Sequence, residues 1–288
     1  MKVGICSFSF HRTIGAGEMD VFSYIDTCAS LGCTQIDPWS AHLCPPENAE
    51  AVLKAGKNPN QSHELLAGVD NAFLERVAAH AKRVGLPFGT LAVDGAHIYE
   101  ESPEAFASNR IRAEQWIDAA GRLGAAQIRI DAGGPAVLTD AIFDRIVGGY
   151  HALLSRAKRA GVELLIENHW GPSTNPERLI RILDACPGLG LLFDTRNFPA
   201  ERREAARKLL APHARATHLK SKRFDPTGDD ADDPMAACIN ILLDAGYTGV
   251  WGIESVPEDG EELSAARKSI ELLHRTLDQH KNSVQNRR

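Results

Sequence analysis

The stretch VELLIENHWGPSTNPERLIRILDACPGLGLLFDTRN, residues 162–197, contains two short apolar runs that each end in a carboxylate. The first run closes on Glu167, and the second, which follows Gly188, closes on Asp194. Unbroken apolar runs of this length are typical of strands in a parallel sheet that is buried on both faces. Glycine suits the left-handed position just after a helix, so Gly188 indicates a helix-to-strand turn. The stretch therefore predicts two strands of a parallel α/β fold.

The same pattern extends over the chain in both directions. The eight candidate strands are VGICSFSF from Val3, TQIDPWS from Thr34, LPFGTLAVDG from Leu86, AQIRIDAGG from Ala126, VELLIENHW from Val162, LGLLFDTRN from Leu189, ATHLKSK from Ala216 and VWGIESV from Val250. Amphipathic segments lie between them, including Ala72–Val84, Ile142–Ala160 and Ser264–Leu277. Turn glycines precede most strands, at Gly32, Gly85, Gly124, Gly161, Gly188 and Gly246. Eight strands that alternate with helices predict a single (β/α)8 TIM barrel.

An open, doubly wound sheet is the other fold with this alternation, and the sequence does not favour it. No GxGxxG follows the first strand and no phosphate-binding GxxxxGK[ST] occurs. The glycine-rich turn at 133–135 is too short to be either motif. At 288 residues the chain has the length of one barrel. We expect one domain over residues 1–280, a polar tail over 281–288, and a long loop over the barrel mouth between Cys44 and Asp70.

Composition excludes several classes of function. A formal charge of −6 lacks the basic face that nucleic-acid binders carry. The start has no signal-peptide core, and no apolar stretch is long enough to span a membrane. The six cysteines form no CxxC pair, so we interpret them as reduced core thiols rather than a disulfide framework or a zinc knuckle. We expect a cytoplasmic, globular protein.

Four polar residues interrupt or end the last four apolar strands, namely Glu167, Asp194, His218 and Glu254. The carboxyl ends of barrel strands form the face where such enzymes place their chemistry. One buried carboxylate would pair with arginine or lysine, but four such residues on consecutive strands are explained more simply by a shared cation. Three carboxylates and one imidazole suit Mn²⁺, Mg²⁺ or Co²⁺, and Zn²⁺ is also compatible. The pattern predicts one divalent metal ion per chain.

The motifs LLIENH, LLFDTRN, THLKSK and GVWGIES together resemble the sugar phosphate isomerase/epimerase superfamily, the xylose isomerase-like TIM barrels. The resemblance covers nearly the whole chain. It implies that Glu167, Asp194, His218 and Glu254 are the metal ligands, with Mn²⁺ favoured, and that both glutamates serve as the catalytic acid/base pair. It also implies isomerisation or epimerisation of a carbonyl sugar or related polyol through a metal-stabilised enediolate. Dehydration of a keto-inositol or 3-keto-glycoside by the same site is the alternative.

Further polar residues near the strand ends are candidates for substrate binding: Lys220, His169, Asn197, Arg223, Arg129 and His11. Two of them have a structural alternative, since Lys220 can pair with a ligand carboxylate and Arg129 with Asp131 in a buried salt bridge. Asn197 stands where many relatives have a histidine, and an amide cannot shuttle a proton. Three other residues could line the mouth, namely Asp37, Trp39 and His97.

Two rival functions remain open from the sequence. An endonuclease of the same superfamily uses three metals and more histidine ligands, which the acidic charge and the single ligand set do not favour. A sugar-binding barrel without turnover would keep the fold, although intact Glu167 and Glu254 favour an enzyme. We expect a small-molecule sugar or keto-polyol as the partner, no nucleic acid and no membrane. The sequence is compatible with a homo-oligomer.

Overall fold

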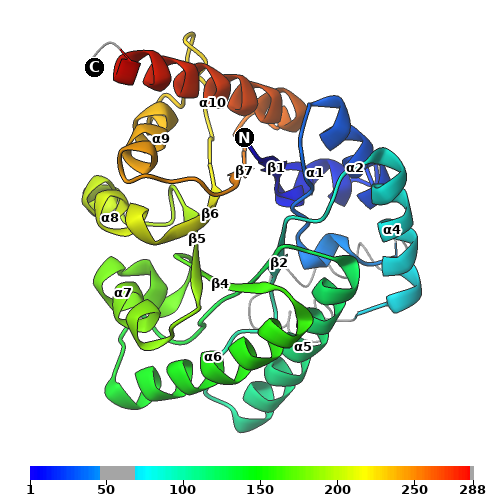
Figure 1. The fold of residues 1–288 in the computed structure, drawn as a ribbon, viewed down its shortest axis with the longest axis vertical. Helices are drawn as coiled ribbons and strands as arrows, with labels where there is room; N and C mark the ends of the chain where they lie inside the picture. The colour runs from blue at the N-terminus through cyan, green and yellow to red at the C-terminus, as the bar shows by residue number, and fades with distance from the viewer. Residues whose placement is uncertain (46–68, 286–288) are drawn as a thin grey trace.

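The computed structural model describes residues 1–45 and 69–285, and Figure 1 shows a ring of strands with helices outside it. The long loop that we predicted between Cys44 and Asp70 lies almost wholly outside the described residues. The strands are β1 (Val3–Ile5), β2 (Thr90–Val93), β3 (Gln127–Ile130), β4 (Glu163–Glu167), β5 (Gly190–Asp194), β6 (Ala214–His218) and β7 (Trp251–Ile253). The α-helices are α1 (His11–Gly15), α2 (Val21–Ser30), α4 (Asn71–Val84), α5 (Pro103–Leu123), α6 (Asp140–Ala160), α7 (Pro176–Ala185), α8 (Arg203–Leu210), α9 (Met235–Asp244) and α10 (Glu262–Gln285). Short 3-10 turns include η1 (Ser7–Phe10) and η2 (Ser40–His42).

All paired strands run parallel, and the ring closes around the barrel axis. Strands β2 to β6 form one five-stranded sheet in chain order, and β1 pairs with β7. Isolated bridges join the two sheets on one side, where Leu219 pairs with Ile253 after β6. On the other side, residues 34–39 bridge to Cys6 and to the chain around β2. The predicted TIM barrel is therefore confirmed.

The second predicted strand, from Thr34, forms bridges but no regular strand. Side chains replace part of its ladder: the carboxylate of Asp37 accepts the Thr90 N–H at 2.8 Å, and the Asp37 N–H donates to the Tyr24 hydroxyl at 3.1 Å. Pro38 has no backbone N–H and therefore cannot donate to a strand ladder. The segment is thus held in the ring by backbone hydrogen bonds, such as that from the Ala92 N–H to Pro38 O at 3.1 Å, together with side-chain hydrogen bonds.

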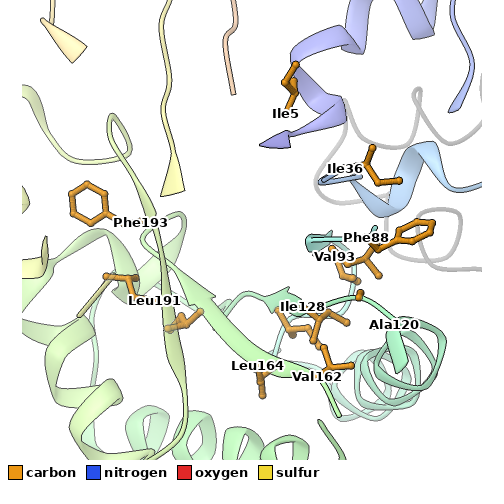
Figure 2. Packing of buried hydrophobic residues seen from close by; sticks show 14 of the residues in the cluster. Ile5, Ile36, Phe88, Val93, Ala120, Ile128, Val162, Leu164, Leu191 and Phe193 are labelled. Atoms are coloured by element: carbon orange, nitrogen blue, oxygen red, sulfur yellow. The ribbon is translucent and has the colours of Figure 1, made fainter. Parts of the chain in front are cut away.

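Two apolar layers lie on the two faces of the ring. The larger fills the space between strands and helices, and Figure 2 shows Ile128 and Leu164 of neighbouring strands in this layer beside Ala120 of α5. Alternating residues point the other way, so Leu165, Leu192 and Ala216 form a small separate cluster inside the barrel. Three predicted turn glycines, Gly85, Gly124 and Gly161, end α4, α5 and α6 in the left-handed conformation.

Helix α10 ties the end of the chain to its beginning. Glu262 at its start accepts the backbone N–H groups of Arg12 and Thr13 at 2.9 Å each. The helix continues to Gln285, so the predicted polar tail from residue 281 is helical over its described part. The reason is local: residues 278–285 contain neither glycine nor proline, and Lys281 pairs with Asp278 at 3.2 Å. None of the helices in the described ranges combines the length and apolar character that crossing a bilayer demands.

Candidate active site

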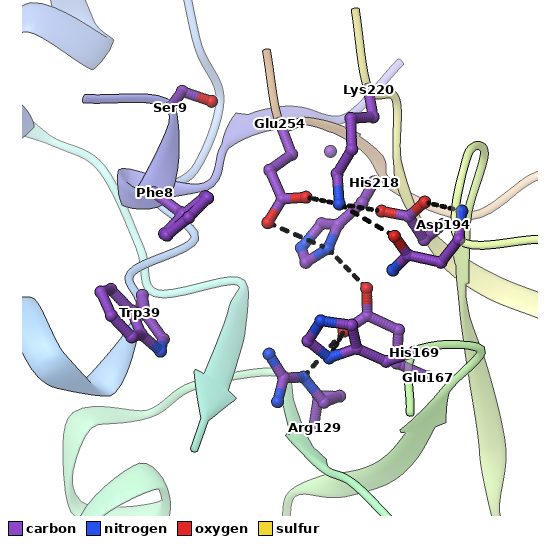
Figure 3. A network of polar contacts seen from close by, with 12 residues as sticks. Phe8, Ser9, Trp39, Arg129, Glu167, His169, Asp194, His218, Lys220 and Glu254 are labelled. Atoms are coloured by element: carbon purple, nitrogen blue, oxygen red, sulfur yellow. Dashed lines mark hydrogen bonds and ion pairs between the residues drawn. The ribbon is translucent and has the colours of Figure 1, made fainter. Parts of the chain in front are cut away.

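The four predicted strand-end residues meet at the carboxyl ends of the strands (Figure 3). Glu167, Asp194 and His218 are the last residues of β4, β5 and β6, and Glu254 directly follows β7. Their side chains point into the barrel because inward and outward positions alternate along each strand. Asp194 and His218 are direct partners in the β5–β6 register. All four are buried, Glu254 being the most accessible at 7%.

His218 lies between the two glutamates. Its Nδ1 is 3.1 Å from a Glu167 oxygen and 3.6 Å from a Glu254 oxygen. The Lys220 ammonium completes the cluster, at 2.8 Å from Asp194 Oδ2 and 2.7 Å from Glu254 Oε2. Figure 3 shows these groups converging on one small volume at the barrel mouth.

The charges in this cluster compensate one another. Burial disfavours the His218 cation, but Glu254 and Glu167 outweigh it and hold the pKa of the imidazole well above its usual value. Burial likewise opposes ionisation of Glu254, yet Lys220 and His218 lower the pKa of that carboxyl to about 2. For Asp194 burial prevails over the attraction of Lys220, and its pKa is raised. The carboxylates of the cluster are therefore balanced by the positive charges of His218 and Lys220.

This donor set fits a divalent cation. The reactive atoms of Glu167, Asp194 and His218 lie within 4.8 Å of one another, as the ligands of a common ion must. The Lys220 ammonium already stands as a cation between Asp194 and Glu254. Oxygen-rich donors with one imidazole match the preferences of Mn²⁺, Mg²⁺ and Co²⁺.

A second group of charges supports the cluster from β3. Arg129 donates to Asp94 at 2.6 Å and to Asp131 at 3.0 Å, and its Nε lies 3.0 Å from Glu167. The structural alternative foreseen for Arg129, a buried pair with Asp131, is thus present and extends to Glu167. His169 Nδ1 lies 2.9 Å from Asp131 and 3.8 Å from Glu167. This candidate therefore lies at the edge of the cluster of predicted metal ligands.

The other predicted substrate contacts fall into two groups. Asn197 is near the cluster. Its side-chain oxygen accepts a hydrogen bond from Lys220 at 3.3 Å, and its backbone N–H donates to Asp194 Oδ1. His11 is set back, with its ring stacked on Phe8 at 4.5 Å and its Nδ1 3.2 Å from Glu262. Arg223 has a largely exposed side chain that pairs with Asp232, away from these groups.

An aromatic wall faces the charged groups across the mouth (Figure 3). Phe8 of η1 and Trp39 meet edge to face with ring centroids 5.3 Å apart. The Trp39 indole N–H donates to Asp94 at 2.9 Å, so the wall is tied to the network around Arg129. Trp39 was foreseen as lining the mouth, whereas Phe8 was not singled out. The sequence signal for Phe8 was its position, because it is an aromatic residue three positions before the candidate residue His11.

Cys6 is a buried core thiol, as we interpreted it, with 1% of the residue exposed. Its sulphur also lies within 4.8 Å of His218 and Glu254, a position that the sequence did not indicate. Burial, the largest effect, raises the pKa of this thiol. Strand alternation could have indicated its direction, because Ile5 faces the helices and the next residue must face the barrel interior.

With the fold and site in place, comparison with known families gives a clear assignment. The family model described as "Xylose isomerase-like TIM barrel" matches residues 25–276. The chain belongs to this family, in agreement with the resemblance of its strand-end motifs. A comparison with curated proteins gave no match.

Solved structures of low sequence identity share the fold over almost the whole chain. L-ribulose 3-epimerase is 16% identical with a TM-score of 0.71, covering 99% of this chain and 97% of that one. The 3-keto-D-glucoside 4-epimerase of E. coli is 13% identical with a TM-score of 0.67, covering 95% and 99%. The probable 3-DHS dehydratase of Bacillus anthracis is 15% identical with a TM-score of 0.67, covering 94% and 98%.

Proposed function

We propose that this chain is a divalent-metal-dependent isomerase or epimerase that acts on a carbonyl sugar or a related polyol. The observation behind the proposal is the placement of Glu167 and Glu254, which flank His218 at 3.1 and 3.6 Å from its Nδ1. They come from β4 and from the end of β7, so they reach one volume from two directions. Two carboxylates on two sides of a bound molecule are what proton removal and return require. The family and the epimerase titles of similar structures support this choice.

Glu167, Asp194, His218 and Glu254 would hold the single cation, with Mn²⁺ favoured and Mg²⁺, Co²⁺ or Zn²⁺ also suited to the donors. When bound, the cation supplies a Lewis acid for the carbonyl and a neighbouring hydroxyl of the substrate. The ammonium of Lys220, which now spans Asp194 and Glu254, can then hold a substrate oxygen.

The two glutamates would perform the proton transfers. One takes the proton from the carbon beside the carbonyl, and the electron pair of that C–H bond moves onto the substrate to give an enediolate. A glutamate then returns the proton. Return to the opposite face inverts the carbon, whereas return to the adjacent carbon moves the carbonyl. Arg129, with its Nε 3.0 Å from Glu167, holds that carboxylate in place for this role.

The aromatic wall would bind the less polar side of the substrate. The C–H face of a sugar packs well against an aromatic ring, and Phe8 and Trp39 present rings toward the charged groups (Figure 3). The mouth thus offers polar groups for the oxygens and aromatic carbon for the hydrogens of one ligand.

Dehydration is the second candidate, and the position of His169 favours it. A departing hydroxyl needs a proton donor near the base that removes the C–H proton. His169 lies 3.8 Å from Glu167, is fixed by Asp131 at 2.9 Å, and keeps a quarter of its side chain exposed. The probable dehydratase with the same fold is consistent with such chemistry.

Deuterium exchange tests the proposal before the product is known. The protein is loaded with Mn²⁺ and incubated in D₂O with free ketoses, keto-inositols, hydroxypyruvate and 3-keto-glycosides. We expect one substrate class to gain deuterium beside its carbonyl, as detected by mass spectrometry. Loss of the mass of water would identify dehydration instead.

The matched control is Glu163→Gln, which changes a glutamate at the opposite end of β4, where it binds Gln127 at 2.7 Å. Exchange should persist in this variant and disappear in the double variant of Glu167 and Glu254. A protein that binds Mn²⁺ but exchanges no member of the panel would contradict the proposal and favour the sugar-binding barrel without turnover.

A further inference from the structure

The end of β1 brings a sulphur atom to the same imidazole that the carboxylates share. The Cys6 N–H donates to Ile253 O at 2.7 Å, which aligns Cys6 with the last part of β7. Ile5 and Ile253 are direct partners and both pack in the layer under the helices. The residues that follow them, Cys6 and Glu254, therefore both face the barrel interior.

Cys6, His218 and Glu254 have the spacing of metal ligands. The thiol, the imidazole and one carboxylate oxygen lie within 4.8 Å of one another, and all three residues are buried. Ligands of a tetrahedral zinc ion, at about 2.0–2.3 Å from the metal, are about 3.5 Å apart. Small changes in side-chain torsions would therefore be enough to bring the three atoms onto one ion.

The environment of Cys6 differs from that of two other buried cysteines, Cys186 and Cys238. Cys186 follows α7 at the opposite end of the barrel, and its sulphur contacts Val147 O at 4.0 Å. Cys238 lies inside α9 among apolar side chains. Cys6 packs with Trp39, Ala41 and Ala92, and its sulphur also lies within 4.8 Å of the His218 imidazole and the Glu254 carboxylate.

We propose that Cys6, His218 and Glu254 form a binding site for a thiophilic divalent cation such as Zn²⁺ or Cd²⁺. Thiolate selects soft and borderline cations, whereas the carboxylate set with Glu167 and Asp194 suits Mn²⁺ and Mg²⁺. On binding, the thiol proton passes to solvent and the sulphur lone pair forms the bond to the cation. The two sites share His218 and Glu254, so they cannot be filled together.

Competition between the two sites has a consequence that rests on the proposed function. A cation bound through Cys6 lies nearer β1 and engages Glu254, which is then withdrawn from proton transfer. We expect Zn²⁺ or Cd²⁺ to displace Mn²⁺ and to inhibit the enzyme. The binding site itself does not depend on any catalytic activity.

Spectroscopy of the intact protein tests the thiolate directly. We expect a cobalt-loaded sample to show the near-ultraviolet charge-transfer band of a thiolate–Co²⁺ bond, and a zinc-loaded sample to show a sulphur neighbour at about 2.3 Å by X-ray absorption. The band should disappear in Cys6→Ser and persist in Cys186→Ala, the matched cysteine control. Cadmium affinity should fall about tenfold or more in Cys6→Ser, and by a larger factor than Mn²⁺ affinity does.

The outcomes separate this proposal from the catalytic one. Wild-type protein that binds Co²⁺ and Zn²⁺ without a sulphur neighbour overturns the thiolate site, even if Cys6→Ser fails to fold. A band that survives in folded Cys6→Ser also overturns it. A sulphur signature with no deuterium exchange on any substrate supports the thiolate site and contradicts the proposed isomerase.

Discussion

Two buried imidazoles at the barrel mouth have pKa values that move in opposite directions. His42 of η2 is 5% exposed, meets Trp39 at 5.0 Å, and shares a hydrogen bond of 2.8 Å with Ser7. Burial, with the charge of His11 adding to it, lowers the pKa of His42 to about 3. His218 is buried to a similar extent, but Glu254 and Glu167 outweigh burial and raise its pKa.

The difference divides the mouth into a neutral half and a charged half. Burial alone penalises the cation, so a protonated imidazole indicates carboxylates placed next to it. The charged half consists of the ends of β4 to β7, and the neutral half consists of η1, η2 and the residues just before η2. In the proposed function, cation binding and proton transfer would belong to the first half, and contact with the apolar face of a substrate would belong to the second.

The largest effect should follow from neutralising the acid and base of the charged half. Glu167→Gln and Glu254→Gln should each lower kcat by about 10²–10⁴-fold, because glutamine keeps the shape but cannot accept a proton. Turnover is measured at saturating Mn²⁺, with metal occupancy determined for each variant. If the two residues act on opposite faces of one carbon, the variant that keeps the abstracting base should still exchange the substrate C–H with deuterium, which would identify that base. Near-normal turnover at full occupancy would exclude that glutamate from proton transfer.

A pair of histidine variants compares the two halves directly. His218→Ala should weaken Mn²⁺ binding by about 100-fold, since even indirect partners of a metal site contribute 10- to 100-fold. His42→Gln should leave the affinity unchanged, because its imidazole contacts Ser7 and Trp39. Titration calorimetry measures both. Equal affinities in the two variants would remove His218 from the ligand set.

Removing the aromatic ring tests the neutral half. Trp39→Leu should raise KM by about tenfold, since aromatic contacts contribute about 0.5–1.5 kcal/mol beyond burial, while kcat changes less. Trp39→Phe should recover most of the loss. Mn²⁺ affinity serves as the internal control and should not change. A large fall in metal affinity would mean that the two halves are not independent.

The smallest expected effect is the pH dependence of stability due to His42. Its folded pKa of about 3 lies below the unfolded value of 6.5, so the unfolded chain binds more protons between these pH values. Stability is therefore full above about pH 6.5 and falls as the pH is lowered. Between pH 7 and pH 6 the contribution should fall by about 0.7 kcal/mol. Urea unfolding of wild type and His42→Gln measures it, and identical pH slopes would show that His42 is not buried neutral.

The charged half could be predicted from sequence, and the neutral half mostly could not. Glu167, Asp194, His218 and Glu254 each follow or interrupt an apolar run, so the pattern marks both the strand and the face where it ends. No comparable contrast marks Phe8, because an aromatic residue at the end of an apolar run looks like more core. Its direction depends on the 3-10 turn that follows β1.

Prediction from the sequence was also limited by contacts between strands that are distant along the chain. Sequence alone offered two roles for Lys220, and only the structure places its ammonium between Asp194 and Glu254. The proximity of Cys6 to His218 connects the end of β1 with the end of β6 and has no spacing that a motif could record. The segment from Thr34 forms isolated bridges rather than a regular strand, and its own Asp37 side chain accepts the Thr90 N–H.

The pairing of β1 with β7 also sets an order of events during synthesis. Val3 pairs with Trp251, so this side of the first strand must wait for nearly the whole chain, whereas its other side bonds to the segment from Thr34 and β2 to β6 find their neighbours in turn. Such distant contacts are the slowest to form. We expect a nascent chain stopped before residue 250 to protect the amides of β3 to β5 from hydrogen exchange while the Cys6 N–H, which donates to Ile253 O, exchanges freely. Until β7 is made, the cysteine at the end of β1 would be a reactive thiol open to the solvent.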